Sequence, residues 1–189
     1  MIPMLYDCFK HWAEKGSVFI FSDTHFNDLD CKLMDENWIS PEEQIKILNK
    51  DLQRGCNTLV LLGDVGDLSY VKQLKAKHKV LIKGNHDDKA KELYHEVFDE
   101  VFEGPVFIAE KILLSHEPID GLDFCMNIHG HDHAGIYRKN HLNVAANVYN
   151  YRAINLGNEI KNGLLSNINT IHRETINKAT ARKKERKKK

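Results

Sequence analysis

The chain has little proline and little cysteine, and it lacks any long hydrophobic run. Its 189 residues include 4 prolines and 4 cysteines. The cysteines (Cys8, Cys31, Cys56 and Cys125) are widely and irregularly spaced, with no C-x-x-C pair, which argues against a zinc knuckle and against a disulfide framework. We expect buried free thiols in a reducing cytoplasm.

No apolar run approaches the roughly 20 residues that a membrane span needs, and the N-terminal residues lack the plan of a signal peptide. The chain also lacks an excess of charge: 27 basic and 27 acidic residues give a formal net charge of zero. With 42% hydrophobic and 29% charged residues, the composition excludes a disordered chain and a collagen-like fibre. The length suits one domain with its own core.

The charge is nevertheless unevenly placed. The segment Arg182–Lys189 carries seven basic residues and one acidic residue, which leaves the remainder of the chain with a net charge of −6. We therefore expect a single domain over residues 1–175 and a flexible basic tail over 176–189. The tail is interpreted either as a solvated, frayed end or as a tether to nucleic acid or another polyanion.

Hydrophobic patterning divides the chain into two halves. In the first half, buried strands alternate with helices, which predicts a parallel sheet. The expected strands are Ser17–Ser22, Thr58–Leu62 and Lys79–Ile82, and the expected helices are Leu5–Glu14, a segment from Pro41 to about Gly55, Leu68–Lys77 and Asp88–Phe98.

The second half is richer in short strands. They are expected at Pro105–Ala109, Lys111–Ser115, Met126–His129 and Leu142–Ala146, with a C-terminal helix after about Glu159. A second sheet packed on the first accommodates them. The predicted fold is α/β, a four-layer α/β/β/α sandwich of two mixed sheets packed face to face with helices outside.

Polar side chains gather where the expected strands end. Five segments contribute them: Asp23 and His25; Asp64 and Asp67; Asn85 and His86; His116; and His131 and His133. Ligands of α/β proteins bind at the carboxyl ends of the strands, so these residues are expected at one rim. Taken singly, a strand histidine is more often a packed core residue, and a Gly-Asp pair is usually a turn. Five such segments at successive strand ends indicate a site instead.

The donor types indicate a metal centre. Carboxylate oxygen, imidazole nitrogen and amide oxygen without thiolate suit borderline divalent ions such as Mn, Fe, Co, Ni or Zn. The seven candidate ligands exceed the need of one tetrahedral ion and match two ions that share a carboxylate. They are Asp23, His25, Asp64, Asn85, His116, His131 and His133.

The motifs D-x-H, G-D-x-x-D, G-N-H-D and G-H-x-H, in this order, resemble those of the calcineurin-like metallophosphoesterase superfamily. The similarity covers roughly Val18–Leu156 and is greatest to small, uncapped bacterial and phage-type members. Two departures from that pattern, Asn27-Asp28 and Ala153, touch no candidate ligand, but the first alters the loop on the substrate side.

The resemblance implies roles for the individual residues. Asp23, His25 and His133 would hold the first ion, and Asn85, His116 and His131 the second. Asp64 would bridge the two ions. His86 would lie beside the substrate, oriented by Asp67.

The implied activity is hydrolysis of a phosphate ester by a bridging hydroxide between two divalent ions, for which we expect Mn²⁺, with Fe, Ni, Co or Zn as alternatives. We favour a phosphodiesterase acting on a nucleotide, cyclic nucleotide or nucleic acid. A phosphomonoesterase and a non-catalytic binding module on the same fold remain alternatives. The oligomeric state is not predicted.

A few other residues carry weaker predictions. Asp28, His129 and Arg152 are candidate substrate contacts. Asp87 is expected to be a helix N-cap. Trp38 is expected to pack in the core or to form a wall of the site.

Overall fold

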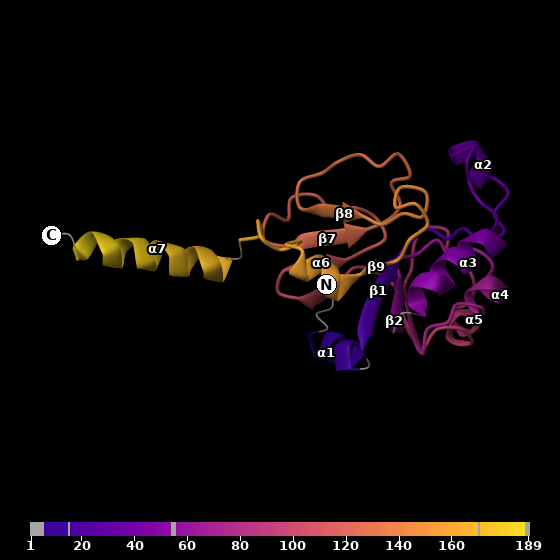
Figure 1. Cartoon of the computed structure of the whole chain (residues 1–189), viewed down its shortest axis with the longest axis horizontal. Coiled ribbons are helices and arrows are strands. Elements are labelled where there is room, and N and C mark those ends of the chain that lie inside the picture. The colour runs from indigo at the N-terminus through magenta and orange to yellow at the C-terminus, as the bar shows by residue number, and fades with distance from the viewer. Residues whose placement is uncertain (1–5, 15, 54–55, 170, 188–189) are drawn as a thin grey trace.

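Two sheets form the centre of the protein (Figure 1). The computed structural model describes residues 6–14, 16–53, 56–169 and 171–187. The first sheet has the order β4-β3-β2-β1-β9 and the second the order β5-β6-β7-β8. The strands are β1 (Ser17–Phe21), β2 (Cys56–Leu61), β3 (His78–Ile82), β4 (Glu100–Phe102), β5 (Val106–Ala109), β6 (Ile112–Leu114), β7 (Met126–His129), β8 (His141–Asn143) and β9 (Ile154–Asn155).

The first sheet is buried on both faces. Strands β1 to β4 are parallel to their neighbours, and β9 runs antiparallel to β1. Alternate residues of a strand point to opposite faces, so Phe19 and Phe21 belong to one hydrophobic cluster while Val18 and Ile20 belong to another. This explains why these strands are almost continuously apolar in sequence.

The second cluster joins the two sheets. Ile20 and Val60 from the first sheet share it with Ile112, Leu114 and Ile128 from the second. In the second sheet, β5 and β6 are antiparallel, whereas β6, β7 and β8 run parallel to one another. Two mixed sheets packed face to face, with helices against them, confirm the expected α/β sandwich.

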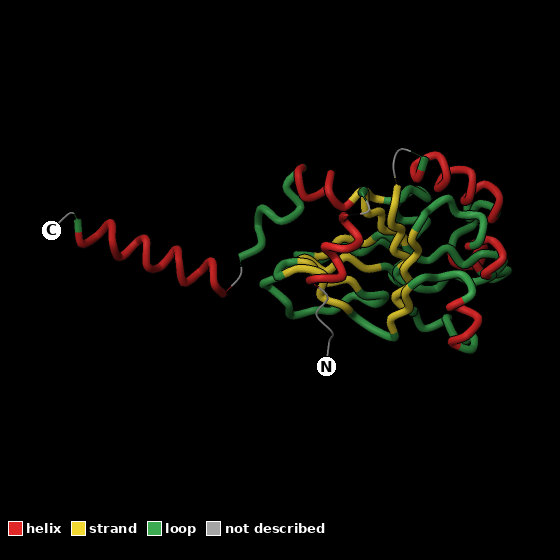
Figure 2. Tube along the Cα trace, turned by 90° about the horizontal axis from the view of Figure 1, so that it is seen from below, coloured by secondary structure: helices red, strands yellow, loops and turns green. Residues whose placement is uncertain are grey.

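The helices of the described chain lie outside the sheets (Figures 1 and 2). Those following β1 to β3 cover the face opposite the second sheet. Ser40 and Glu43 form a capping box at the start of α3, where Pro41 is the first helical residue, as the sequence predicts. The helices are α1 (Tyr6–Glu14), α2 (Cys31–Met34), α3 (Pro41–Leu52), α4 (Leu68–Val71), α5 (Lys91–His95), α6 (Leu156–Lys161) and α7 (Ile171–Arg186).

Two helices are shorter than the sequence predicts. The expected helix Leu68–Lys77 ends as α4 at Val71, because the Asn49 side chain binds the Gln73 carbonyl and the Lys75 amide and holds that segment in a turn. The expected helix Asp88–Phe98 is reduced to α5. The short elements α2, β4 and β9 are not anticipated by the sequence patterns.

Helix α7 projects away from the two sheets (Figures 1 and 2). It spans residue 175, the expected boundary between domain and tail, and includes much of the basic segment. Among the described residues, none of the helices combines the length and the apolar character that crossing a membrane requires.

Candidate metal centre

The carboxyl ends of β1 and β2 build one side of the site. Hydrogen bonds from Asp23 N to Gly63 O (3.1 Å) and from His25 N to Asp64 O (2.9 Å) connect the two loops. Asp23, His25 and Asp64 adopt positive φ angles of 56°, 40° and 51°, a region that non-glycine residues seldom occupy. The chain therefore turns sharply at both strand ends, which brings the three side chains together.

A first group of possible ligands combines Asp23, His25 and His133. One donor atom from each lies within 4.8 Å of the others. His133 comes from the loop after β7, and its Nε2 lies 3.7 Å from Asp23 Oδ1. The first sheet thus supplies two donors and the second sheet one.

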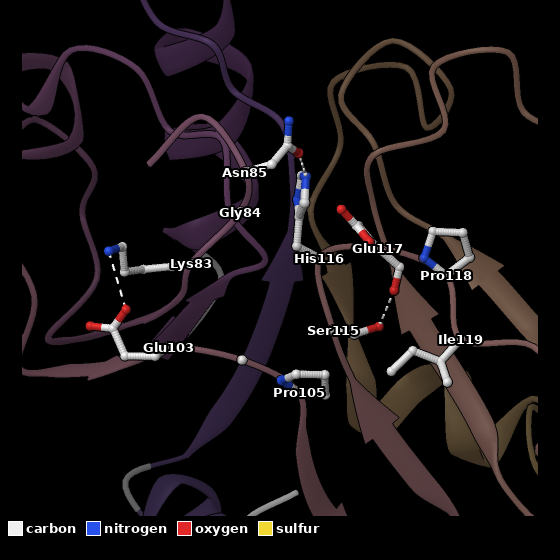
Figure 3. A pocket seen from close by; sticks show the side chains of 11 residues that line it. Lys83, Gly84, Asn85, Glu103, Pro105, Ser115, His116, Glu117, Pro118 and Ile119 are labelled. Carbon is white, nitrogen blue, oxygen red and sulfur yellow. Dashed lines mark hydrogen bonds and ion pairs between the residues drawn. The ribbon is translucent and has the colours of Figure 1, made fainter. Parts of the chain in front are cut away.

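A second group combines Asp64, His116 and His131, whose donor atoms also lie within 4.8 Å of one another. His116 Nε2 is 3.2 Å from Asp64 Oδ2 and 3.1 Å from His131 Nδ1. Asn85 Oδ1 joins this group, at 2.8 Å from His116 Nε2 (Figure 3) and 3.1 Å from His131 Nδ1. Four donors therefore converge on one point.

Asp64 links the two groups. Its Oδ2 atom lies 3.6 Å from His25 Nε2 of the first group and 3.2 Å from His116 Nε2 of the second. The Asp64 side chain is buried, and its other oxygen accepts a hydrogen bond from His86 N at 2.9 Å. Its carboxylate is thus fixed between the two groups.

A buried nitrogen without a partner, together with the donor types of the site, is consistent with binding of divalent ions. His25 Nε2 is buried and has no hydrogen-bond partner, although the imidazole is surrounded by other donor groups. An orphaned nitrogen of this kind costs free energy unless a ligand satisfies it. The donor set contains imidazole, carboxylate and amide groups, which suit borderline divalent ions.

The pKa shifts of the buried groups also favour a bound cation. Burial raises the pKa of Asp23, even though His116 and His133 favour its charged form. For His116, burial works to lower the pKa, but the hydrogen bond with Asp64 and the charges of Asp23 and Asp64 raise it to about 9. The buried carboxylates thus draw positive charge to the centre, and divalent cations supply such charge.

Partners outside the ligand groups orient three of the histidines. Asp28 Oδ2 lies 3.1 Å from His25 Nδ1, and Leu62 O lies 2.8 Å from His116 Nδ1. In both rings this leaves Nε2 directed toward the donor cluster. Such contacts fix the tautomer and the ring orientation of metal-binding histidines.

Asn147 does the same for His133, with Oδ1 3.0 Å from Nδ1. Its amide nitrogen donates to the His133 carbonyl at 3.0 Å and to Asp35 Oδ2 at 3.3 Å. Sequence reasoning missed Asn147, because a lone asparagine in a loop carries no spacing signal.

A family model for calcineurin-like phosphoesterases matches residues 16–176, most of the chain. The chain belongs to the calcineurin-like phosphoesterase family. Among solved structures it resembles the protein of unknown function AQ665 from Aquifex aeolicus, with 26% sequence identity and a TM-score of 0.62 over 77% of this chain and 98% of that chain. No curated protein matches it significantly. Family membership supports metal-dependent hydrolysis of phosphate esters.

In this phosphoesterase, Asp87 is not the helix N-cap that the sequence suggests. Ala90 holds that position at α5. The buried Asp87 carboxylate instead accepts hydrogen bonds from Asp64 N (2.8 Å), Val65 N (3.1 Å) and Gly84 N (2.8 Å). Two of these partners belong to the loop after β2 and one to the loop after β3, so Asp87 ties the two loops together.

His86 and Asp67 contact different parts of the protein. His86 is exposed, and its ring centroid lies 5.5 Å from that of His25. Asp67 caps α4 by accepting a hydrogen bond from Ser69 N at 2.9 Å. The described residues show no hydrogen bond between Asp67 and His86. The structure thus brings His86 to the cluster and gives Asp67 a capping role.

The three weaker candidates lie in different surroundings, and Asp28 lines a hollow beside the ligand groups. Asp28 supports His25, as described above. His129 is 1% exposed, with Nδ1 2.8 Å from Gly130 O. The strand alternation that made His129 a candidate ends at His131, whose φ is 64°. Arg152 donates both ends of its guanidinium to Asp51 at the end of α3.

Hollows flank the ligand groups on two sides. One, of about 290 Å³, is lined by Asn85, His116 and Lys83 and continues along Pro118 and Ile119 (Figure 3). Lys83 in this hollow donates to Glu103 at 3.2 Å.

The other hollow, of about 230 Å³, is lined by His25, Asp28 and Trp38. The Trp38 ring lies 5.9 Å from the His25 ring and 5.6 Å from the His133 ring, measured between centroids. Trp38 therefore both packs in the core and forms a wall of the site, two roles that the sequence analysis treated as alternatives.

Proposed function

We propose that this chain is a phosphodiesterase with a dinuclear metal centre, for which Mn²⁺ is the expected metal. Asp23, His25 and His133 would hold one ion, and Asp64 would bridge to the second. The second ion would be held by Asn85, His116 and His131. The observation that carries the proposal is the meeting of two complete ligand groups at one buried carboxylate, since Asp64 Oδ2 lies within 3.6 Å of a histidine from each.

When bound, two divalent ions supply Lewis acidity and a water activated as nucleophile near neutral pH. The residues of the chain contribute position and proton transfer. The exposed His86 ring lies beside His25, where a phosphoryl group on the centre would meet it. We assign it contact with a phosphoryl oxygen and donation of a proton to the leaving oxygen. Its backbone is held by the hydrogen bond from His86 N to Asp64, so its place relative to the ligands is fixed.

The two hollows favour a diester over a monoester. A phosphodiester carries substituents on two of its oxygens, and the centre has a hollow on the Asn85–His116 side and another on the His25–Trp38 side. A monoester would need only one of them. The substrate classes proposed are cyclic nucleotides, nucleic acids and nucleotides whose phosphate carries a second ester substituent, because each of these presents a phosphodiester.

The test is hydrolysis of bis-p-nitrophenyl phosphate compared with p-nitrophenyl phosphate, using protein loaded with Mn²⁺. We expect the diester to be hydrolysed faster, and His86→Ala to lower kcat by roughly 10²- to 10⁴-fold, the range for a lost proton donor. Asp64→Ala is expected to abolish activity and to reduce bound metal, measured by elemental analysis. His95→Ala, at an exposed position on α5, is the matched control.

Other results would redirect the proposal. Faster hydrolysis of the monoester identifies a phosphomonoesterase. Two bound ions per chain without turnover of either ester indicate a binding module on this fold. Activity that survives full chelation refutes the metal-dependent mechanism altogether.

A further inference from the structure

The end of the chain presents a dense, unneutralised positive charge. Every residue from 175 to 187 is exposed. None of the cations in this stretch forms an ion pair with another described residue. The stretch contains one acid, Glu185, and six cations: Lys178, Arg182, Lys183, Lys184, Arg186 and Lys187.

Helix α7 offers no apolar face to a partner. Within the exposed stretch Ile176 is the one large hydrophobic side chain, and it is 40% exposed. A helix that inserts into a membrane surface, or packs in a coiled coil, needs a continuous apolar stripe. Its absence leaves charge as the means by which α7 can recognise another molecule.

Repulsion between these like charges also destabilises the helix that carries them. Lys178 and Arg182, and Arg182 and Arg186, are spaced four residues apart, which places like charges next to each other on the helix surface. Phosphate groups bound along the helix would relieve this repulsion, so a polyanion is expected to stabilise the helix as it binds.

We propose that α7 is a nucleic-acid-binding arm that contacts the phosphate backbone without reading sequence. Lysine and arginine contacts to phosphates supply sequence-independent affinity through release of counterions. The remainder of the chain, with its net charge of −6 outside Arg182–Lys189, repels nucleic acid. Helix α7 extends away from both sheets (Figure 1), so it would anchor a polymer outside the metal centre. The inference stands independently of the proposed catalytic function.

The test is binding of the full chain to a fluorescein-labelled 30-base-pair DNA duplex, followed by anisotropy. If about four phosphates are contacted, the slope of log K against log salt is about −3.6, and affinity falls on the order of 100-fold between 50 and 200 mM NaCl. The helicity of the chain, followed by circular dichroism, is expected to rise when DNA is added.

One variant replaces the six cations of the exposed stretch with glutamine, which retains helix propensity. We expect it to lose at least about tenfold in DNA affinity at 50 mM NaCl. Its rate with bis-p-nitrophenyl phosphate should equal that of the wild type, because the six residues lie outside the metal centre. The control variant makes the same change of charge at six exposed lysines elsewhere: Lys46, Lys50, Lys75, Lys77, Lys91 and Lys161.

Retention of DNA affinity by the control, with loss by the α7 variant, supports the arm. Equal loss of DNA affinity in both variants shows that binding depends on the overall charge of the chain rather than on α7. This result overturns the proposal. Wild-type affinity in the α7 variant overturns it as well. Binding to vesicles containing 30% phosphatidylserine (roughly the anionic content of a cytoplasmic leaflet) without binding to DNA would assign the arm to membranes instead.

Discussion

Asp87 offers the sharpest test of how the site is held together. Its buried carboxylate accepts three backbone N–H groups, two from the loop after β2 and one from the loop after β3. Oδ2 accepts from Asp64 N and Gly84 N, both at 2.8 Å, and Oδ1 accepts from Val65 N at 3.1 Å. We predict that Asp87→Asn weakens both the fold and the metal site.

The size of the effect follows from these contacts. An asparagine that places its oxygen at the Oδ2 position keeps two hydrogen bonds in neutral form and turns its NH₂ group toward the Val65 N–H. Each bond to a charged acceptor contributes about 1.5–3 kcal/mol, and a buried donor left unpaired costs about 1–3 kcal/mol. Two weakened bonds and one lost bond therefore predict a destabilisation of about 2–4 kcal/mol.

The assay is urea unfolding of the metal-free protein, so that loss of metal does not contribute. A destabilisation of this size moves the midpoint by about 1–2 M for a slope near 2 kcal/mol/M. Asp88→Asn is the matched control, because Asp88 is the next residue and is exposed. If the free energies of unfolding of Asp87→Asn and Asp88→Asn differ by less than about 0.5 kcal/mol, the hydrogen bonds of Asp87 do not stabilise the fold as proposed.

Three further outcomes are expected. Gly130→Ala should reduce metal binding, because the added Cβ would lie 2.0 Å from Asp23 Oδ2; Gly104→Ala, with nothing within 4 Å, should behave as wild type in the same elemental analysis. Arg152→Gln should lower stability by about 1–3 kcal/mol in urea by leaving buried Asp51 unpaired, with unchanged kcat on small esters. Mn²⁺ at 100 times its Kd should stabilise the protein by about 2.7 kcal/mol in thermal melts, and no shift of Tm would contradict a specific site.

The sequence predicted the fold well where burial dictates residue type. The apolar runs at β1, β2 and β3 are continuous because both faces of the first sheet are covered, and their pattern identifies them without further information. The start of helix α3 was also predicted, because Ser40 is a favoured N-cap residue and Pro41 is a favoured first residue of a helix. The lengths of the short helices α4 and α5 were overestimated, and α4 ends where the side chain of the distant Asn49 binds the segment that follows it. Local patterns carry no record of such contacts.

The candidate metal site also contains residues that the sequence indicates and residues that it does not. The candidate ligands could be proposed from the sequence because each one closely follows a strand, and parallel strands bring their carboxyl ends to one edge. The supporting residues could not, because their positions depend on how loops fold back. Asn147 reaches His133 from 14 residues further along the chain, and Asp87 reaches Asp64 across 23. Neither pair lies within one helix or strand, so no local pattern in the sequence marks these pairs.

The backbone at the site explains why such support is needed. Asp23, His25, Asp64 and His131 all have positive φ, between 40° and 64°. Non-glycine residues in this region cost on the order of 1 kcal/mol or more each, and they persist only where the surrounding structure holds them. The hydrogen bonds of Asp87 to the loops after β2 and β3 supply part of that constraint. Because the same four residues are candidate ligands, an ion that binds them would also favour their strained conformation. Fold stability and metal occupancy should therefore change together in variants of the supporting residues.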